Sequence, residues 1–110
     1  MVEIIFAYIT AKSKSEAKKI GSALVKERLC SCVNIFPEMN SIFWWKGKLE
    51  EANEAVLIAK TTKSKFVKLS ARVKELHSYE CPCILELKIT NGNKEYVNWL
   101  LENLHAARQA

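Results

Sequence analysis

The chain has 110 residues, of which 49% are hydrophobic and 26% are charged. This length and composition predict a single globular domain spanning residues 1–110, and they exclude a disordered or fibrous chain. The formal net charge of +5 is compatible with a nucleic-acid partner, so that class of function has to be tested against the motifs.

The first segment, residues 2–9, is apolar and rich in strand-forming side chains, which predicts a central strand buried on both faces. No basic region precedes it and Glu3 lies within it, so it is unlike a signal peptide. No apolar run is long enough to span a membrane. We therefore expect a cytoplasmic protein in which the four cysteines stay reduced and act as thiols or metal ligands.

A helix is expected next, because Ser13 and Glu16 form a capping box ahead of an amphipathic pattern. The pattern continues to about Leu29. Most of the basic residues of this segment fall on its outer face, which is typical of a solvated helix surface and not of a nucleic-acid site.

The middle of the chain predicts a long, bent β-hairpin. Its first strand begins at Cys32, Pro37 marks a bulge or an edge, and Gly47 marks the turn. Strands of this length outreach a domain of 110 residues, so the distal part of the hairpin should pack against an identical subunit. The residues expected in that interface are Phe43, Trp44 and Trp45.

In the last third, Thr62 is expected to cap a second helix that ends before His77, and Asn93 to cap a third. Between them, the alternation of residues 84–89 predicts a strand with one buried and one solvated face, with Leu85, Leu87 and Ile89 on the buried face. The order β, α, β, β, α, β, α is typical of the ferredoxin-like split βαβ arrangement. We therefore predict an α+β fold with a four-stranded antiparallel sheet, helices on one face and an extra C-terminal helix.

One short connection, residues 77–83, holds an imidazole, a phenol, a carboxylate and two thiols. Its thiols, Cys81 and Cys83, are two residues apart, and Cys30 and Cys32 repeat the spacing. In extended backbone this spacing points both side chains to the same face. Two such pairs could face a soft metal ion.

Four segments are specific in combination: residues 28–35, 45–50, 60–61 and 77–82. Through them, and through Gly92, Asn93, Tyr96 and Trp99, nearly the whole chain resembles the CutA family, the divalent-cation tolerance proteins. The resemblance implies the ferredoxin-like fold and a homotrimer assembled through the long strands. It also implies a cytoplasmic location in microbes and tolerance of copper and other divalent metals, with metal binding but no established reaction.

Two positions depart from the family pattern. Ser78 stands where the family usually has proline, which loosens the turn after His77. Cys83 stands where the family usually has an acidic residue, so a hard oxygen donor is replaced by a soft sulfur donor. If this position lines a metal site, its preference should shift toward Cu(I) or Zn.

The leading hypothesis is a non-enzymatic, labile metal site, for copper first and zinc second, with the ligands His77, Cys32 and Cys83. Plain structural roles compete with it: Cys32 as a small buried residue and His77 as a helix-end residue. Paired C-x-x-C clusters are absent, so a permanent structural zinc ion is not expected.

Three other classes remain. A PII-like sensor would bind an anionic small molecule in a cleft between subunits, lined by Lys60, Glu50, Tyr79, Glu80 and Trp45. An enzyme would need a cysteine nucleophile with His77 as its base, a geometry that a sequence does not display. A nucleic-acid module would need the aromatic RNP pattern, which the chain lacks, so no nucleic-acid or membrane partner is expected.

Overall fold

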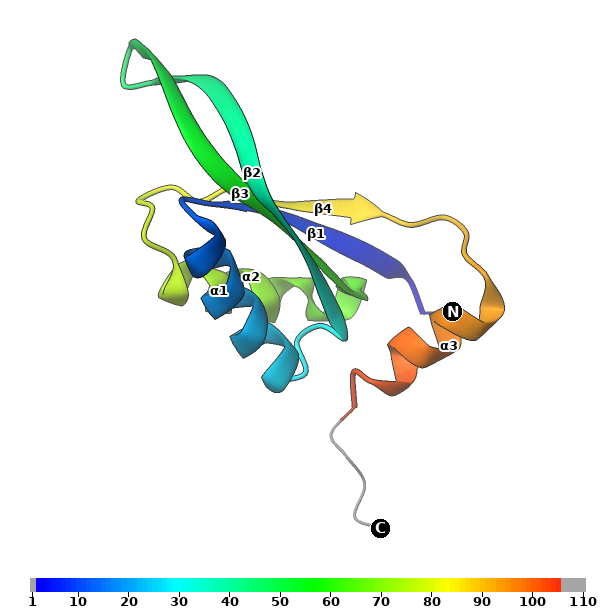
Figure 1. The fold of residues 1–110 in the computed structure, drawn as a ribbon. Helices are drawn as coiled ribbons and strands as arrows, with labels where there is room; N and C mark the ends of the chain where they lie inside the picture. The colour runs from blue at the N-terminus through cyan, green and yellow to red at the C-terminus, as the bar shows by residue number, and fades with distance from the viewer. Residues whose placement is uncertain (1, 106–110) are drawn as a thin grey trace.

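The computed structural model describes residues 2–105. It holds a four-stranded antiparallel sheet with the strand order β2-β3-β1-β4. Helices α1 and α2 lie against one face of the sheet, and α3 follows at the end of the sheet where β1 begins (Figure 1). The predicted ferredoxin-like α+β fold with an extra C-terminal helix is confirmed. The elements are β1 Ile4–Ala11, α1 Lys14–Lys26, β2 Cys32–Trp45, β3 Lys48–Thr62, a 3-10 turn Lys63–Lys65, α2 Phe66–Leu76, β4 Ile84–Lys88 and α3 Lys94–Glu102.

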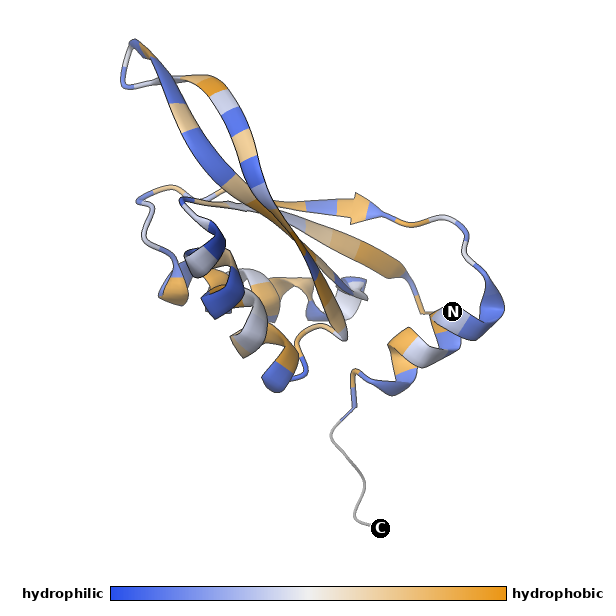
Figure 2. Cartoon of the chain, in the orientation of Figure 1, coloured by the Kyte–Doolittle hydropathy of each residue, from blue (hydrophilic) through white to orange (hydrophobic). Residues whose placement is uncertain are grey.

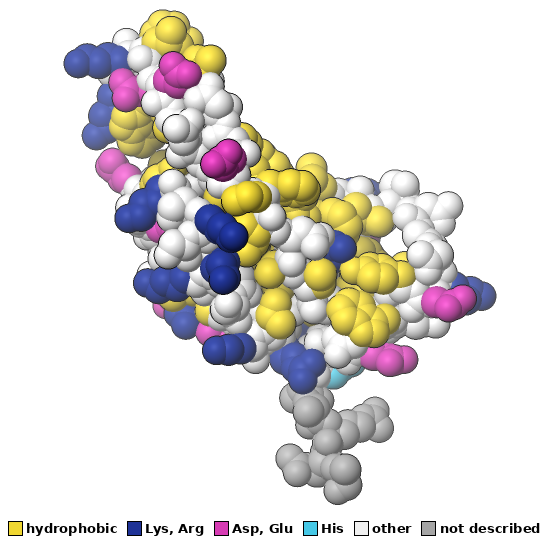
Figure 3. Space-filling view, in the orientation of Figure 1, with side chains coloured by type: hydrophobic (Ala, Val, Ile, Leu, Met, Phe, Trp, Pro, Cys, Tyr) yellow, Lys and Arg dark blue, Asp and Glu magenta, His cyan; other side chains and the backbone are white. Residues whose placement is uncertain are grey.

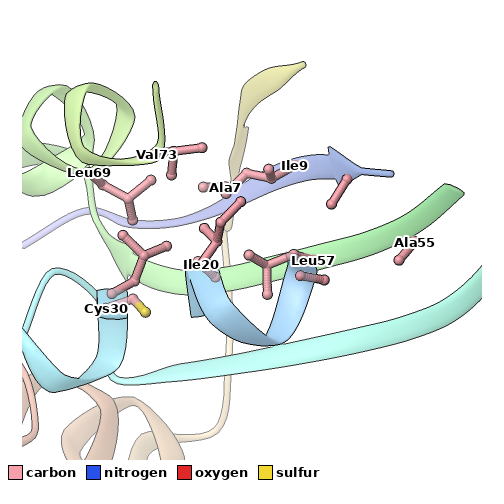
Figure 4. Packing of buried hydrophobic residues seen from close by; sticks show 12 residues of the cluster. Ala7, Ile9, Ile20, Cys30, Ala55, Leu57, Leu69 and Val73 are labelled. Carbon is pink, nitrogen blue, oxygen red and sulfur yellow. The ribbon is translucent and has the colours of Figure 1, made fainter. Parts of the chain in front are cut away.

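The main core lies between the sheet and the helices α1 and α2 (Figure 4). The central strand β1 sends Ala7 and Ile9 into it, opposite Ala59 and Leu57 of β3. Hydrophobic colouring runs along β1 and along the part of β3 beside it in Figure 2, whereas the outer part of β3 is largely hydrophilic. The residues that point into the core, such as Ala7 and Ile9, alternate along each strand with residues on the other face, as expected when one face of a sheet is covered by helices. The helices and the chain after α1 complete the cluster with Ala17, Ile20, Leu24, Cys30, Leu69 and Val73.

Helix α1 begins as predicted and ends earlier than predicted. Ser13 caps it by accepting a hydrogen bond from the Glu16 backbone N–H at 3.1 Å. The expected end near Leu29 is wrong, because the helix ends at Lys26 and Arg28 adopts a left-handed backbone conformation with φ 60°. The Arg28 guanidinium donates to the Asn103 carbonyl at 3.0 Å, which ties the end of α1 to the end of α3.

The hairpin of β2 and β3 projects from the body, and the molecule measures 52 Å along its longest axis against 29 and 23 Å along the others (Figure 1). The bulge expected at Pro37 is confirmed by a register shift between Phe36 and Met39. At the tip, Lys46 and Gly47 both have positive φ, which matches a two-residue turn suited to the twist of a hairpin.

Two local expectations about the last third are corrected. Thr62 does not cap α2 through its side chain: a 3-10 turn precedes the helix, and the Thr62 hydroxyl lies 3.1 Å from the Ser64 hydroxyl. The expected burial of Leu85 and Leu87 does not occur within the subunit, where these residues are 57% and 46% exposed. They share one side of β4, as the alternation predicts, but that side faces away from α1 and α2.

These leucines belong to a wider uncovered surface on the sheet. Leu87 and Leu85 of β4 lie opposite Phe6 and Tyr8 of β1, and Tyr8 lies opposite Ile58 of β3. Residues directly opposite in an antiparallel pair share a face. We call this surface the open face and define it as Phe6, Tyr8, Phe36, Ile58, Leu85 and Leu87.

Only one end of the sheet is covered on that side, where Leu100 of α3 and Leu104 of the turn after it pack against Ile4. Elsewhere, hydrophobic side chains reach the surface over the sheet and along the hairpin (Figure 3). Within the part of the chain that the structure describes, no helix is long and apolar enough to cross a membrane.

Candidate functional site

The loop of residues 77–83, here called the His77 loop, lies between α2 and β4 and is anchored by the imidazole of His77. The His77 side chain is fully buried. Its Nδ1 atom accepts a hydrogen bond from the Tyr79 backbone N–H at 3.0 Å, and its Nε2 atom lies 2.7 Å from the Thr10 carbonyl oxygen. Because Nδ1 accepts, Nε2 carries the proton and donates to Thr10, which fixes the neutral tautomer. Both ring nitrogens are therefore engaged with the backbone.

Glu16 attaches the same loop to the first turn of α1. Its carboxylate accepts hydrogen bonds from the backbone N–H groups of Lys12 at 3.0 Å and Ser78 at 2.9 Å. Burial acts to raise the pKa of Glu16, but the hydrogen bonds from Ser78 and Lys12 outweigh it, so that the pKa lies below its usual value. The charged carboxylate of Glu16 thus links the first turn of α1 to the His77 loop.

A second carboxylate, Glu54 of β3, holds the middle of the loop. The Tyr79 hydroxyl donates to Glu54 Oε2 at 2.7 Å, and the Tyr79 ring lies 4.7 Å from the His77 ring between centroids. Burial and the Glu54 carboxylate raise the pKa of Tyr79 above its usual value. The phenol is therefore a hydrogen-bond donor at neutral pH and is not poised to ionise.

The end of the loop carries the thiols. Cys81 is exposed and Cys83 is partly buried, and neither is in a disulfide. Burial and the charge of Glu54 raise the pKa of the Cys83 thiol, against an opposing side-chain hydrogen bond with Thr10. Cys83 therefore lies close to Glu54 and to Thr10, the residue whose carbonyl oxygen holds His77.

The three predicted metal ligands do not come together within one subunit. His77 and Cys83 both contact Thr10, but Cys32 lies across from Lys60, which in turn lies across from Phe6. Phe6 and Thr10 are four residues apart on β1, a distance of roughly 13 Å along the strand. Among residues 2–105, no group of three or more His, Cys, Asp or Glu side chains is arranged to hold a metal ion.

The second cysteine pair does not share a face. Cys30 lies beyond the end of α1 and is fully buried in the core. Its burial raises its pKa to about 12. Cys32 opens β2 and is only partly buried. The same-face geometry expected for this pair is therefore wrong, because the backbone between them turns out of the core into the sheet.

The residues predicted for an anion cleft do not come together in one place within the subunit. Glu80 forms an exposed ion pair with Lys46 at 3.7 Å, and the Lys46 ammonium lies 5.6 Å from the centroid of the Trp45 ring. Lys60 lies apart from them on the sheet, where its ammonium donates to the Tyr96 hydroxyl at 3.0 Å. The remaining members are Tyr79, hydrogen-bonded to Glu54, and Glu50, opposite Phe43 on the hairpin.

A groove of about 490 Å³ runs beside Glu54, where the hairpin leaves the body. Its walls come from the start of α1 and from the bulged part of the hairpin, and they carry both charges: Lys12, Ser13, Lys14, Pro37, Glu38, Met39, Asn40, Asn53 and Glu54. Sequence reasoning did not identify Glu54 or Thr10 as partners of the loop. Their signal in the sequence is weak, since Thr10 acts through its backbone and Glu54 resembles the exposed glutamates around it.

The chain is similar in sequence to known proteins over most of its length. A sequence model of the family described as CutA1 divalent ion tolerance protein matches residues 5–103. A divalent-cation tolerance protein CutA from Thermus thermophilus is 48% identical over 103 residues, covering 94% of this chain and 98% of the relative. Its counterpart from Archaeoglobus fulgidus is 46% identical over 99 residues, covering 90% and 96%.

Solved structures of related proteins have the same fold as this chain. The structure of the A. fulgidus protein, described as a periplasmic divalent cation tolerance protein CutA, superposes with a TM-score of 0.90 at 43% identity and covers 93% of this chain and 99% of that one. CutA1 from Oryza sativa superposes with a TM-score of 0.91 at 35% identity, covering 96% and 97%.

Replacing Glu16 by Gln should destabilise the fold, because an amide has one accepting oxygen for the two backbone N–H groups that the carboxylate satisfies. We expect a loss of about 1–3 kcal/mol in the free energy of unfolding at neutral pH. The folded pKa of Glu16 lies below its usual value of 4.5, so its contribution is present above that pH and is lost as pH falls through the folded pKa. Urea unfolding at fixed protein concentration, repeated from neutral to acidic pH, measures both effects.

The matched control is Glu75→Gln. Glu75 is an exposed glutamate that contacts Arg72 at 3.4 Å, and its replacement should change the free energy by less than about 0.5 kcal/mol. Equal losses for the two variants, or a Glu16→Gln effect that persists unchanged in acid, would contradict the role assigned to Glu16.

Proposed function

This chain belongs to the CutA1 family of divalent ion tolerance proteins, and from that premise we propose that it forms a homotrimer that binds a soft metal ion, copper most readily, in the response to divalent cations. The observation that carries the metal-binding part is the Cys83 thiol, a soft and partly buried donor at the end of the His77 loop, within reach of the negative charge of Glu54. A carboxylate next to a thiol favours a cation, and thiolate ligands select Cu(I) or Zn over hard ions. We assign no catalysed reaction to the chain.

The exposed apolar side chains of the open face support the proposed homotrimer. Phe36, Leu85 and Leu87 are each about half exposed in the subunit, and the aromatic residues of the hairpin extend the same kind of surface outward. Contiguous apolar surface of this kind marks an interface in soluble proteins. A closed assembly in which the sheets face one another and the helices point outward would cover it, and we propose three copies, the number that the family resemblance implies.

The interface residues expected on the hairpin fit this arrangement. Phe43, Trp44 and Trp45 lie on the outer part of β2, and Trp44 is 73% exposed. Large aromatic side chains are enriched in interfaces because they bury much area with few rotatable bonds. Their place between subunits remains a proposal that rests on this exposure.

Leu85→Arg should break the assembly, because it places a charge in the middle of a face that must become dry. Val67→Arg is the matched control: Val67 is a 78% exposed aliphatic residue on α2, on the opposite side of the sheet. We expect sedimentation equilibrium to give the 12.5 kDa subunit mass for Leu85→Arg and three times that mass for the control. A trimeric Leu85→Arg variant would contradict the proposed interface.

The three predicted ligands differ in how readily they could bind an ion. His77 would first have to break one of its two ring hydrogen bonds, and Cys32 would have to approach from a neighbouring subunit. Cys83 needs neither change. We therefore propose that Cys83 is the residue through which the ion binds, with exchange fast enough for a labile site.

Cys83→Ser should weaken Cu(I) binding by the reduced protein, measured by competition with a chromophoric chelator. Cys83→Glu, which restores the oxygen donor usual in the family, should lower the preference for Cu(I) over a hard divalent ion such as Mn²⁺. Weak Cu(I) binding that neither variant changes would remove the metal proposal and favour the sensor described next.

A small-molecule sensor is the second candidate, and Lys60 favours it. The Lys60 ammonium lies 5.7 Å and 5.1 Å from the ring centroids of Phe6 and Tyr96, and no carboxylate within the described part of the chain lies within 4 Å of it. A cation held among aromatic rings without an acidic partner suits an anionic ligand. The other cleft residues would then come from neighbouring subunits.

A cytoplasmic location is part of the proposal, because thiol ligands stay reduced there. The description of the A. fulgidus protein as periplasmic concerns that relative.

A further inference from the structure

We propose that Cys81 and Cys83 form a two-coordinate, bis-thiolate site for Cu(I). The inference rests on the metal-binding function proposed above. It adds the second ligand, which is Cys81 and neither Cys32 nor His77, and it specifies the oxidation state of the ion.

The other two cysteines and His77 are less suited to bind the ion because of their surroundings. Cys30 is fully buried among the core residues beneath the helices. The two ring nitrogens of His77 are occupied by the Thr10 carbonyl oxygen and the Tyr79 N–H. Cys32 lies across the strand pair from the cation of Lys60, whose charge opposes a second cation.

Cys81 and Cys83 have the opposite properties. Cys81 is exposed, Cys83 is partly buried, and both lie in the irregular end of the His77 loop, ahead of β4. The backbone bends at Cys81 and has no bend at Pro82 or Cys83. The proline disfavours helical backbone at Cys81, and where such a segment is extended, side chains two residues apart point to one side. The Cα atoms are then roughly 6–7 Å apart. The two thiols are close enough for their charges to interact.

The loop is held in place from its other end. His77 is hydrogen-bonded to β1, Ser78 to Glu16 of α1, and Tyr79 to Glu54 of β3. These bonds fix the residues before Cys81, while β4 begins directly after Cys83 and pairs with β1. The dithiol segment is therefore short and anchored on both sides, which limits the entropy lost when both sulfurs bind one ion.

The number of donors selects the ion. Zinc in proteins is almost always held by four ligands in structural sites and by three in catalytic sites. The described residues contain no cluster of three suitable side chains here. Copper(I) is soft, has a filled d shell and is satisfied by two thiolates in a linear arrangement, so two sulfurs suffice for it. Glu54, beside Cys83, supplies negative charge without being needed as a ligand.

Binding involves no change of oxidation state. Two Cu–S bonds form, the two thiol protons pass to the buffer, and copper enters and leaves as Cu(I). The ion must therefore be supplied in reduced form, as it is in a reducing compartment.

The test uses the full, reduced protein and four forms: unaltered, Cys81→Ser, Cys83→Ser and Cys32→Ser. Cu(I) affinity is measured by competition with a chromophoric chelator. We expect one Cu(I) per subunit, and a loss of at least about 100-fold in affinity for each loop variant, since losing even an outer-shell partner of a metal site costs about 10–100-fold. Cys32→Ser, which removes the same thiol elsewhere, should bind as the unaltered protein does. X-ray absorption should show sulfur neighbours and no nitrogen.

The possible failures are distinguishable. Strong Cu(I) binding that survives Cys81→Ser, or that is lost in Cys32→Ser, overturns the bis-thiolate site and leaves metal binding in place. A nitrogen neighbour in the absorption spectrum does the same, and points to His77. No Cu(I) binding by the unaltered protein overturns both this inference and the proposed metal function.

Discussion

The structure depends on a central strand, β1, that is apolar on both faces. One face sends Ala7 and Ile9 into a core closed by α1 and α2. The other face, with Phe6 and Tyr8, meets no helix over most of its length, since α3 covers only the end beside Ile4. A strand buried on both sides needs two layers of cover, and the subunit supplies one and a small part of the second. The homotrimer we propose supplies the remainder, and the projecting hairpin widens the surface that the copies would share.

The same strand positions the candidate site. The Thr10 carbonyl oxygen, near the end of β1, receives His77, and Glu16 and Glu54 hold the next two residues of the loop from α1 and β3. The residues richest in acid–base chemistry thus serve to anchor the loop. The thiols that follow remain at or near the surface, next to a carboxylate. This division of roles explains why we place metal binding at the sulfurs and a structural role at the imidazole.

Sequence patterns predicted the order of elements, the bulge at Pro37 and the caps at Ser13 and Asn93, because each depends on near neighbours in the chain. The errors have longer-range causes. The end of α1 coincides with the left-handed backbone of Arg28, whose guanidinium donates to the Asn103 carbonyl at the other end of the chain. Leu85 and Leu87 alternate as buried residues do, yet alternation does not say whether the cover comes from a helix or from another copy. His77 was predicted to be a metal ligand because histidine is a common one. Its partners in the structure are a backbone carbonyl and a backbone N–H, which no sequence pattern indicates.

The most direct test of the central claim is hydroxyl-radical footprinting of the intact protein, with each residue normalised to its reactivity in the unfolded chain. If copies of the chain cover the open face, Phe36, Leu85 and Leu87 will be oxidised far more slowly than Val67, although all four are substantially exposed in the subunit. If the three open-face residues are oxidised in proportion to their exposure in the subunit, the open face is not an interface and the account of the assembly is wrong.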